Sequence, residues 1–174
     1  MKLGASVERV LRPLVGLRLA RHGRAVDMET FQFGTTTEWR DDKNRLHVRH
    51  EFSLHIQCPW RISNAGELVV GYRDMTDPPS GISLDEFDAN EAPMTRRDEL
   101  LDRFVAGPPT SLLVTRTSAS EYGDLAVDFV GGFRLETFRD HAVLRTREDW
   151  RLLTPGGHWV FEGGRLAAVR RPDD

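Results

Sequence analysis

The chain has a single cysteine, Cys58, among its 174 residues, so no disulfide can form within it. No apolar run approaches the roughly 18 residues that a membrane-spanning helix needs. The first sixteen residues are interrupted by Glu8, Arg9 and Arg12 and lack the apolar core of a signal peptide. These absences predict a cytoplasmic protein that neither crosses nor binds a membrane.

An excess of basic residues is also missing. The sequence carries 24 lysines and arginines against 27 aspartates and glutamates, a net charge of −3. Because nucleic-acid-binding domains usually show a basic surface, we expect no nucleic-acid partner. Lysine is scarce, with Lys2 and Lys43 as its two examples, a bias typical of a GC-rich genome.

Motifs of known catalytic or cofactor sites are absent. There is no Gly-x-Ser-x-Gly, no His-Glu-x-x-His and no kinase signature, and the glycine-rich turns match neither a phosphate-binding loop nor a dinucleotide fingerprint. Cys58 has no second cysteine nearby and no helix start to activate it, so we interpret it as a small buried apolar residue. We therefore predict no catalytic residue, no metal and no cofactor, and we favour a non-enzymatic protein.

The most regular pattern lies between Arg45 and Gly71. From Leu46 to Cys58 the even positions are apolar except for His50, and the odd positions are polar. This alternation is typical of a strand with one buried face, which predicts that all the even side chains face the core. Pro59 should bend or interrupt the strand, and a second strand and a hairpin should follow it up to Gly71.

Helices are expected at two places. A short one should precede Pro13, and a longer one should cover Thr95–Ala106, where Thr95 and Asp98 have the spacing of a capping box. Between them, His22-Gly23 is the expected turn of a hairpin. Gly131-Gly132 and Gly163-Gly164 are two-residue hairpin signals in the second half of the chain.

Short strands separated by tight turns make up most of the pattern. We therefore predict one domain, 1–174, of the α+β class. It should be mainly antiparallel sheet, either one curved sheet or two packed sheets, with the helix at about 95–106 on one face.

An acidic stretch from Asp74 to Glu91 contains no basic residue, and its carboxylates do not follow the ligand spacing of a calcium loop. One interpretation is a solvated loop. The other is a surface that binds a basic protein, because complementary charge steers association. In that hypothesis Phe87, Ile82 and Met94 supply apolar contacts, and the candidate binding residues are Asp74, Asp77, Asp85, Glu86, Phe87, Asp88 and Glu91.

A second hypothesis places a small-molecule pocket where the sheet curves. Its lining would include His50, Trp60, Arg61 and Asp74. His50 could then act as a general base, but a core histidine bonded to a backbone carbonyl is the alternative.

The run LHIQCPWRI with the following ELVVGYRDM, and the late REDWRLLTPGGHWVFEGG, resemble segments of a group of uncharacterised small bacterial proteins of actinobacterial type. Some members of that group are similar to immunity-type proteins, which neutralise a toxin by binding it. The resemblance rests on Cys58, Trp60 and Arg61 and implies no catalytic residue.

Three functional hypotheses follow from the sequence. The first is an immunity-like or accessory binding protein that engages a basic protein through the acidic stretch. The second is a small-molecule-binding protein or enzyme with a pocket near His50 and Trp60. The third is a homodimeric structural module that pairs through an edge strand.

Overall fold

The computed structural model describes residues 2–40, 43–89, 93–142 and 147–169. Its helices are α1 (Leu3–Leu11) and α2 (Arg96–Val105), with short 3₁₀ segments η1 (Arg12–Leu14), η2 (Tyr72–Thr76), η3 (Leu84–Glu86) and η4 (Pro109–Leu112). Its strands are β1 (Leu19–Ala25), β2 (Met28–Arg40), β3 (Leu46–Ile56), β4 (Trp60–Asn64), β5 (Glu67–Gly71), β6 (Val114–Ala119), β7 (Leu125–Phe129), β8 (Phe133–Thr137), β9 (Glu148–Thr154), β10 (Gly157–Glu162) and β11 (Arg165–Val169).

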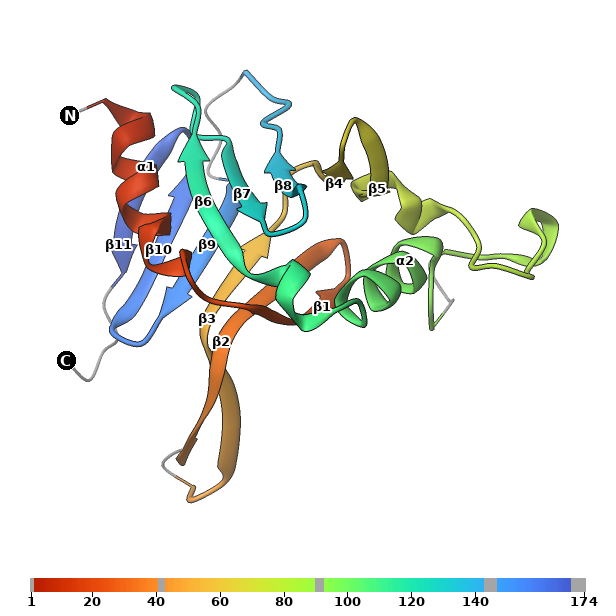
Figure 1. Ribbon diagram of the computed structural model, residues 1–174, viewed down its shortest axis with the longest axis horizontal. Helices are drawn as coiled ribbons and strands as arrows, with labels where there is room; N and C mark the ends of the chain where they lie inside the picture. Colours follow the sequence, from red (N-terminus) through yellow and green to blue (C-terminus); the bar gives the residue numbers. More distant parts are fainter. Residues whose placement is uncertain (1, 41–42, 90–92, 143–146, 170–174) are drawn as a thin grey trace.

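The strands form two antiparallel sheets, which confirms the α+β prediction. One sheet has the order β1-β2-β3-β9-β10-β11 and the other the order β5-β4-β8-β7-β6 (Figure 1). Pro59 lies where the chain passes from β3 in the first sheet to β4 in the second, and the Gln57 and Cys58 amides both donate to the Asp149 carbonyl, at 2.9 and 3.1 Å. The expected interruption at Pro59 is thus a change of sheet.

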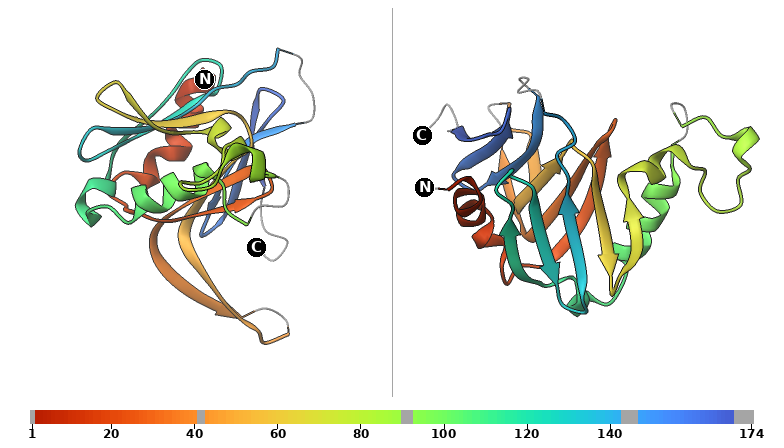
Figure 2. Two further views of the ribbon diagram at one scale, coloured as in Figure 1. Left: turned by 90° about the vertical axis from the view of Figure 1, so that its right-hand side faces the viewer. Right: turned by 90° about the horizontal axis from the view of Figure 1, so that it is seen from above.

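The two helices cover the two open sides of this pair of sheets. Figure 2, seen from above, shows α1 at one side and α2 at the other. Helix α1 contacts β6 and β11, which are edge strands of different sheets, and α2 contacts the opposite edge strands, β1 and β5. No helix in the described ranges is both long and apolar enough to span a membrane.

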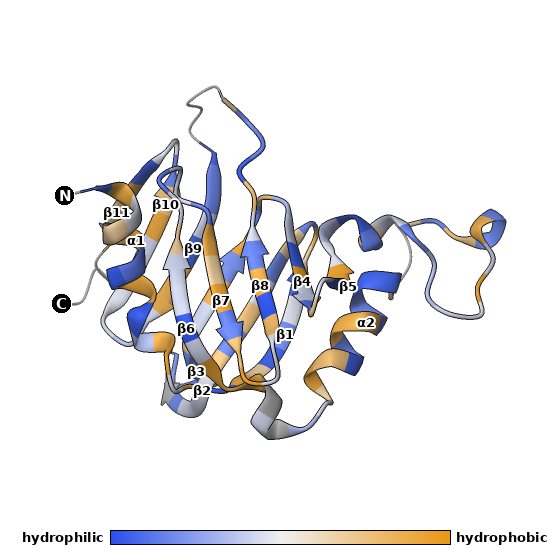
Figure 3. Ribbon diagram, turned by 45° about the horizontal axis from the view of Figure 1, so that its top comes forward, coloured by the Kyte–Doolittle hydropathy of each residue, from blue (hydrophilic) through white to orange (hydrophobic). Residues whose placement is uncertain are grey.

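The core lies between the sheets and follows the alternation of the strands, whose residues switch between hydrophilic and hydrophobic in Figure 3. Trp60 packs edge-on against Phe31, with ring centroids 5.4 Å apart. Trp150 stacks on Phe161 at 5.3 Å. The largest fully buried apolar side chains are Trp60, Trp150, Phe31, Phe33, Phe161, Leu11, Leu14, Leu19, Leu54, Ile56 and Ile62.

The prediction that every even side chain of the central strand is buried is wrong for its first part. Leu54, Ile56 and Cys58 are buried, but Leu46 and Val48 are 51% and 60% exposed. The reason is that β2 and β3 extend past their neighbours as a two-stranded arm (Figure 1). A two-residue period shows which residues share a face, but it cannot show how far the opposite sheet extends.

The expected hairpin turn at His22-Gly23 is also wrong. The turn lies at Val26-Asp27, where Ala25 pairs with Met28 and Val26 adopts φ +59°. This register extends β1 through His22, which places its imidazole beside Glu29 of β2.

Helix α2 confirms the predicted capping box. The Thr95 amide donates to an Asp98 carboxylate oxygen at 2.8 Å, and the Asp98 amide donates to the Thr95 hydroxyl. The buried face of α2 includes Leu101 and Phe104. It also includes Arg97, a charged residue that an apolar stripe does not predict.

Arg97 belongs to a buried polar network that joins α2 to the β1–β2 hairpin. Both Arg97 and Glu29 have side chains with no exposed area, and Arg97 Nε lies 3.3 Å from Glu29 Oε2. His22 bridges Glu29 through Nδ1 at 3.2 Å and Asp102 of α2 through Nε2 at 2.9 Å. Because a buried charge without a partner is costly, this network fixes how α2 sits on the sheet edge.

One glycine sits where a side chain cannot fit. Gly123 has φ +90°, and a Cβ atom there would lie 2.0 Å from Cζ of Phe161. Gly123→Ala should lower the free energy of unfolding by about 3 kcal/mol or more, from backbone strain and displacement of the Phe161 ring. Gly66→Ala is the matched control, because φ is +87° there and no atom lies within 4 Å of the added Cβ. Equal losses in chemical denaturation of the two variants would contradict this account.

The network also predicts a pH dependence. Burial lowers the pKa of His22, but the hydrogen bonds and charges of Glu29 and Asp102 outweigh burial, so the pKa of His22 is raised above its usual value. Stability from protonated His22 is therefore complete below pH of about 6.5 and is lost as pH rises through the raised pKa. Burial also raises the pKa of Glu29, which acts in the same direction at lower pH.

The lowered pKa of His55 contributes with the opposite sign in this window, and it does so in the wild type and in a His22 variant alike. His22→Gln should therefore be less stable than the wild type near pH 6, and the difference in unfolding free energy between the two should shrink as pH rises. His158→Gln, on the outer face of β10, should keep the wild-type slope. A His22→Gln profile parallel to that of the wild type would show that His22 does not carry the effect.

Candidate functional site

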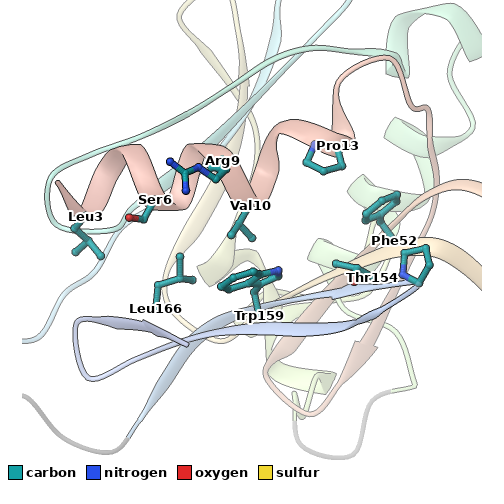
Figure 4. Close-up of a pocket in the computed structure, with 10 residues that line it drawn as sticks. Leu3, Ser6, Arg9, Val10, Pro13, Phe52, Thr154, Trp159 and Leu166 are labelled. Atoms are coloured by element: carbon teal, nitrogen blue, oxygen red, sulfur yellow. The ribbon is translucent and has the colours of Figure 1, made fainter. Parts of the chain in front are cut away.

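An apolar cavity lies between α1 and the inner face of the six-stranded sheet. Its volume is about 590 Å³, within the range of small-molecule sites. Helix α1 forms the roof, and β10, β11 and the ends of β3 and β9 form the floor (Figure 4). We call it the α1 pocket. It is lined by Leu3, Ser6, Arg9, Val10, Pro13, Phe52, Thr154, Pro155, Trp159 and Leu166.

Local structure explains how α1 presents its part of the lining. Leu3, Ser6 and Val10 are three and four residues apart, so they share one face of the helix. Val7 and Leu11 are fully buried and hold the helix on the core. Figure 4 shows Leu3 and Val10 pointing from α1 toward Leu166 and Trp159.

The floor comes from the β10–β11 hairpin. Trp159 and Phe161 alternate on one face of β10, and their cross-strand neighbours on β11 are Ala168 and Leu166. Phe161 is fully packed in the core, whereas Trp159 is only partly buried. The Trp159 indole therefore forms a large apolar surface at the point where the opposite sheet no longer covers the hairpin.

The chemistry of the pocket is mostly apolar, with three polar side chains. Arg9 is the one charged residue among the described residues that line it, and it is exposed on α1. The Thr154 hydroxyl already donates to the Gly157 carbonyl at 3.0 Å, and the Ser6 hydroxyl lies 3.5 Å from the Lys2 carbonyl. Such a lining suits a molecule with a large apolar part that is neutral or negatively charged.

The residues predicted to share a pocket, His50, Trp60 and Arg61, are not brought together. Trp60 is 2% exposed and lies in the core. Arg61 lies on the outer face of β4, where its guanidinium pairs with Glu136 at 3.1 Å. His50 lines a separate, smaller cleft on β3. Its Nδ1 lies 3.1 Å from the Gly34 carbonyl, which agrees with the alternative prediction of a histidine bonded to a backbone carbonyl.

Cys58 is buried in the core. Burial, with the charge of Asp149, raises the pKa of its thiol to about 12. Its thiolate is therefore scarce at neutral pH, which agrees with the interpretation of Cys58 as a small buried apolar residue. Within the described ranges, no group of three or more histidines, cysteines, aspartates or glutamates could hold a metal ion.

The acidic stretch extends away from the sheets between η2 and α2 (Figure 1). Asp77, Asp85, Glu86 and Asp88 are exposed, but Asp74 accepts the Gly71 amide at 2.7 Å and so closes a local turn. Phe87 is partly buried and lines a cavity of about 400 Å³. The other residues that line this cavity are Pro79, Ile82, Glu86, Asp88, Pro93 and Met94. Glu91, the last of the predicted binding residues, lies outside the described residues.

Sequence reasoning missed the residues of the α1 pocket. Phe52, Trp159 and Leu166 are apolar residues on alternating strands, and each of them equally fits a filled core. The N-terminal helix gave no further signal, because its apolar residues Leu3, Val7, Val10 and Leu11 form a single stripe of the kind that packs on a filled core.

Comparisons with known proteins add no assignment. No family model, no curated protein and no solved structure matches the chain. The resemblance to small bacterial proteins, the basic partner and the homodimer therefore remain predictions.

Proposed function

We propose that this protein binds a small, mainly apolar molecule in the α1 pocket. The observation that carries the proposal is the partly exposed Trp159 indole at the floor of a cavity of about 590 Å³ that α1 covers without filling. The pocket is open to solvent on one side, so part of its apolar lining stays in contact with water. A ligand in the pocket would remove that apolar surface from water.

The energetics favour an apolar ligand over a polar one. Each square ångström of apolar surface removed from water contributes about 25 cal/mol, and a ligand here would cover parts of Phe52, Trp159 and Leu166. The hydroxyls of Ser6 and Thr154 already have backbone neighbours, so they add orientation more than affinity. We therefore assign the protein a binding role and no reaction.

Titration calorimetry with decan-1-ol, an uncharged chain with one hydroxyl, tests the proposal. The wild type should bind it. Ser6→Trp should place an indole in the pocket and weaken binding by at least about tenfold, or about 1.4 kcal/mol.

Ala5→Trp is the matched control, because Ala5 is exposed on the same helix and does not line the pocket. It should bind decan-1-ol as the wild type does. Absence of heat with the wild type, or equal affinity of Ser6→Trp and the wild type, would refute the proposal.

A second candidate function is supported by the acidic stretch. Its carboxylates stand beside exposed apolar side chains, with Leu84 67% exposed, Ile82 48% and Met94 43%. Mixed acidic and apolar surfaces of this kind suit a basic protein partner, because charge speeds encounter and apolar contacts slow dissociation. We propose docking of a basic protein here, as in an immunity-like or accessory protein.

Charge reversal tests this second candidate. A partner is first captured from a lysate of the source cells, and its association rate is then measured at low salt. The triple variant Asp85→Lys/Glu86→Lys/Asp88→Lys should slow association by about tenfold or more and change dissociation less.

The control triple variant is Glu67→Lys/Glu121→Lys/Glu162→Lys, which changes the net charge equally at exposed positions outside the stretch. It should slow association less. If both triple variants associate at the same rate, the stretch has no specific role.

A further inference from the structure

A second cavity lies on the other side of α1, against the edge of the five-stranded sheet. Its volume is about 470 Å³. Ala5, Glu8 and Arg12 are three and four residues apart, so they share a face of the helix, which is not the face that lines the α1 pocket. We call this cavity the β6 groove. It is lined by Ala5, Glu8, Arg9, Arg12, Val15, Thr115, Arg116 and Thr117.

The groove lies over an open part of the β6 edge. In this edge strand the Ala119 amide points away from β7 and donates to the Glu8 carboxylate at 3.3 Å. Nearer the start of the strand, the Val114 amide donates to the Leu17 carbonyl at 2.9 Å. Thr117 is two residues before Ala119, so its amide also points away from β7, and no described residue accepts it. The groove therefore offers a backbone donor to a ligand.

Two arginines from different elements meet at the groove. Arg12 directly follows α1 and Arg116 lies on β6, and both are exposed. Among the described residues, neither guanidinium forms an ion pair. The carboxylate of Asp128, the cross-strand neighbour of Arg116, pairs with Arg134 instead. Both positive charges are therefore available to an anion.

The other charged groups of the groove do not cancel this pair. Glu8 is the one acidic residue among the described residues that line it, and its carboxylate accepts the Ala119 amide. Arg9 also lines the groove and has the opposite charge to Glu8, so these two residues together add no net charge. The groove thus keeps the two positive charges of Arg12 and Arg116.

The hydrogen-bonding groups of the groove favour a phosphate over a carboxylate. Each guanidinium can donate two parallel hydrogen bonds, and the amide and hydroxyl of Thr117 add two further donors. Thr115 adds none, because its hydroxyl already donates to the Asp128 carbonyl at 3.1 Å. A phosphate group has three strong acceptor oxygens and nearly two negative charges near neutral pH, whereas a carboxylate has two oxygens and one charge. The phosphate therefore matches both the donors and the two arginines.

We infer that the β6 groove binds a dianionic phosphate group between Arg12 and Arg116, with the Thr117 amide as a further donor. The source of the group is either inorganic phosphate or a small phosphorylated molecule, whose remaining part would extend into solvent. The site goes beyond the proposed function and does not depend on it, because the two cavities lie on different faces of α1 and share the lining residue Arg9.

Titration calorimetry with phenyl phosphate, inorganic phosphate and benzoate tests the inference, at low salt and at a pH of about 7.5, where most of the phosphate is dianionic. The wild type should bind phenyl phosphate at least about tenfold more tightly than benzoate. Binding should weaken as salt is added, because the groove is open to solvent. Arg12→Gln/Arg116→Gln should weaken the binding of phenyl phosphate by at least about tenfold.

The two phosphate probes separate the two sources of the group. Inorganic phosphate that binds as tightly as phenyl phosphate would identify the free ion as the ligand. Weaker binding of inorganic phosphate would identify a phosphorylated molecule.

Arg73→Gln/Arg165→Gln is the matched control, because it removes the same charge from exposed residues that line neither cavity. It should bind phenyl phosphate as the wild type does. Failure of both phosphate probes to bind the wild type, or equal affinity for phenyl phosphate and benzoate, would overturn the inference. Equal weakening in the two double variants would show attraction to the overall charge of the protein and would overturn it as well.

Discussion

The fold depends on how the open edges of its two sheets are closed. A pair of sheets that does not close into a barrel leaves four edge strands, here β1, β11, β5 and β6. Unpaired edges expose backbone hydrogen-bonding groups and invite association. Here each side of the sandwich is covered by one helix, and the Val114 amide ties the second sheet to the segment before β1 by donating to the Leu17 carbonyl at 2.9 Å.

The two closures use different chemistry. On the α2 side, Arg97, Glu29 and His22 join helix and hairpin through groups that have little or no exposed area. Removing one partner from such a network leaves a buried charge, which commonly costs about 3–5 kcal/mol. On the α1 side, the helix is held mainly by apolar contacts through Val7 and Leu11, which depend less on exact geometry, and the Ala119 amide of β6 donates to the Glu8 carboxylate at 3.3 Å. The acidic stretch extends from the α2 side, where the helix is fixed by polar groups. The α1 pocket lies on the opposite side, where the helix is held mainly by apolar contacts.

This asymmetry gives each end of the molecule a different candidate role. The acidic stretch begins in η2, which contacts α2, and extends from there into solvent. The α1 side holds a cavity whose floor is a tryptophan. The two candidate functions use separate residues, so a protein partner and a small ligand could be accommodated together.

Local features of the fold were predictable from the sequence. The capping box at Thr95 and Asp98, the glycine turns and the buried half of β3 depend on residues close together in the chain. The hairpin turn at Val26 was not predictable, because a non-glycine residue at φ +59° gives no sequence signal.

The candidate site could not be predicted from the sequence, because its residues come together only in the folded chain. Phe52, Thr154 and Trp159 meet only because β3, β9 and β10 are neighbours, and strand order is a property of the whole fold. Arg97 shows the same limit, since its partner Glu29 lies in a distant hairpin. Patterns in the sequence indicate which side of a strand is buried, but they do not tell a filled core from an apolar cavity.

The most direct test of the account is fluorine NMR of the protein labelled with fluorotryptophan, with signals assigned by single Trp→Phe variants. Addition of decan-1-ol should shift the Trp159 signal strongly and leave those of Trp60 and Trp150 in place, because both of these indoles are closely packed in the core. An unchanged Trp159 signal under conditions in which decan-1-ol binds would place the ligand elsewhere and contradict the assignment of the α1 pocket.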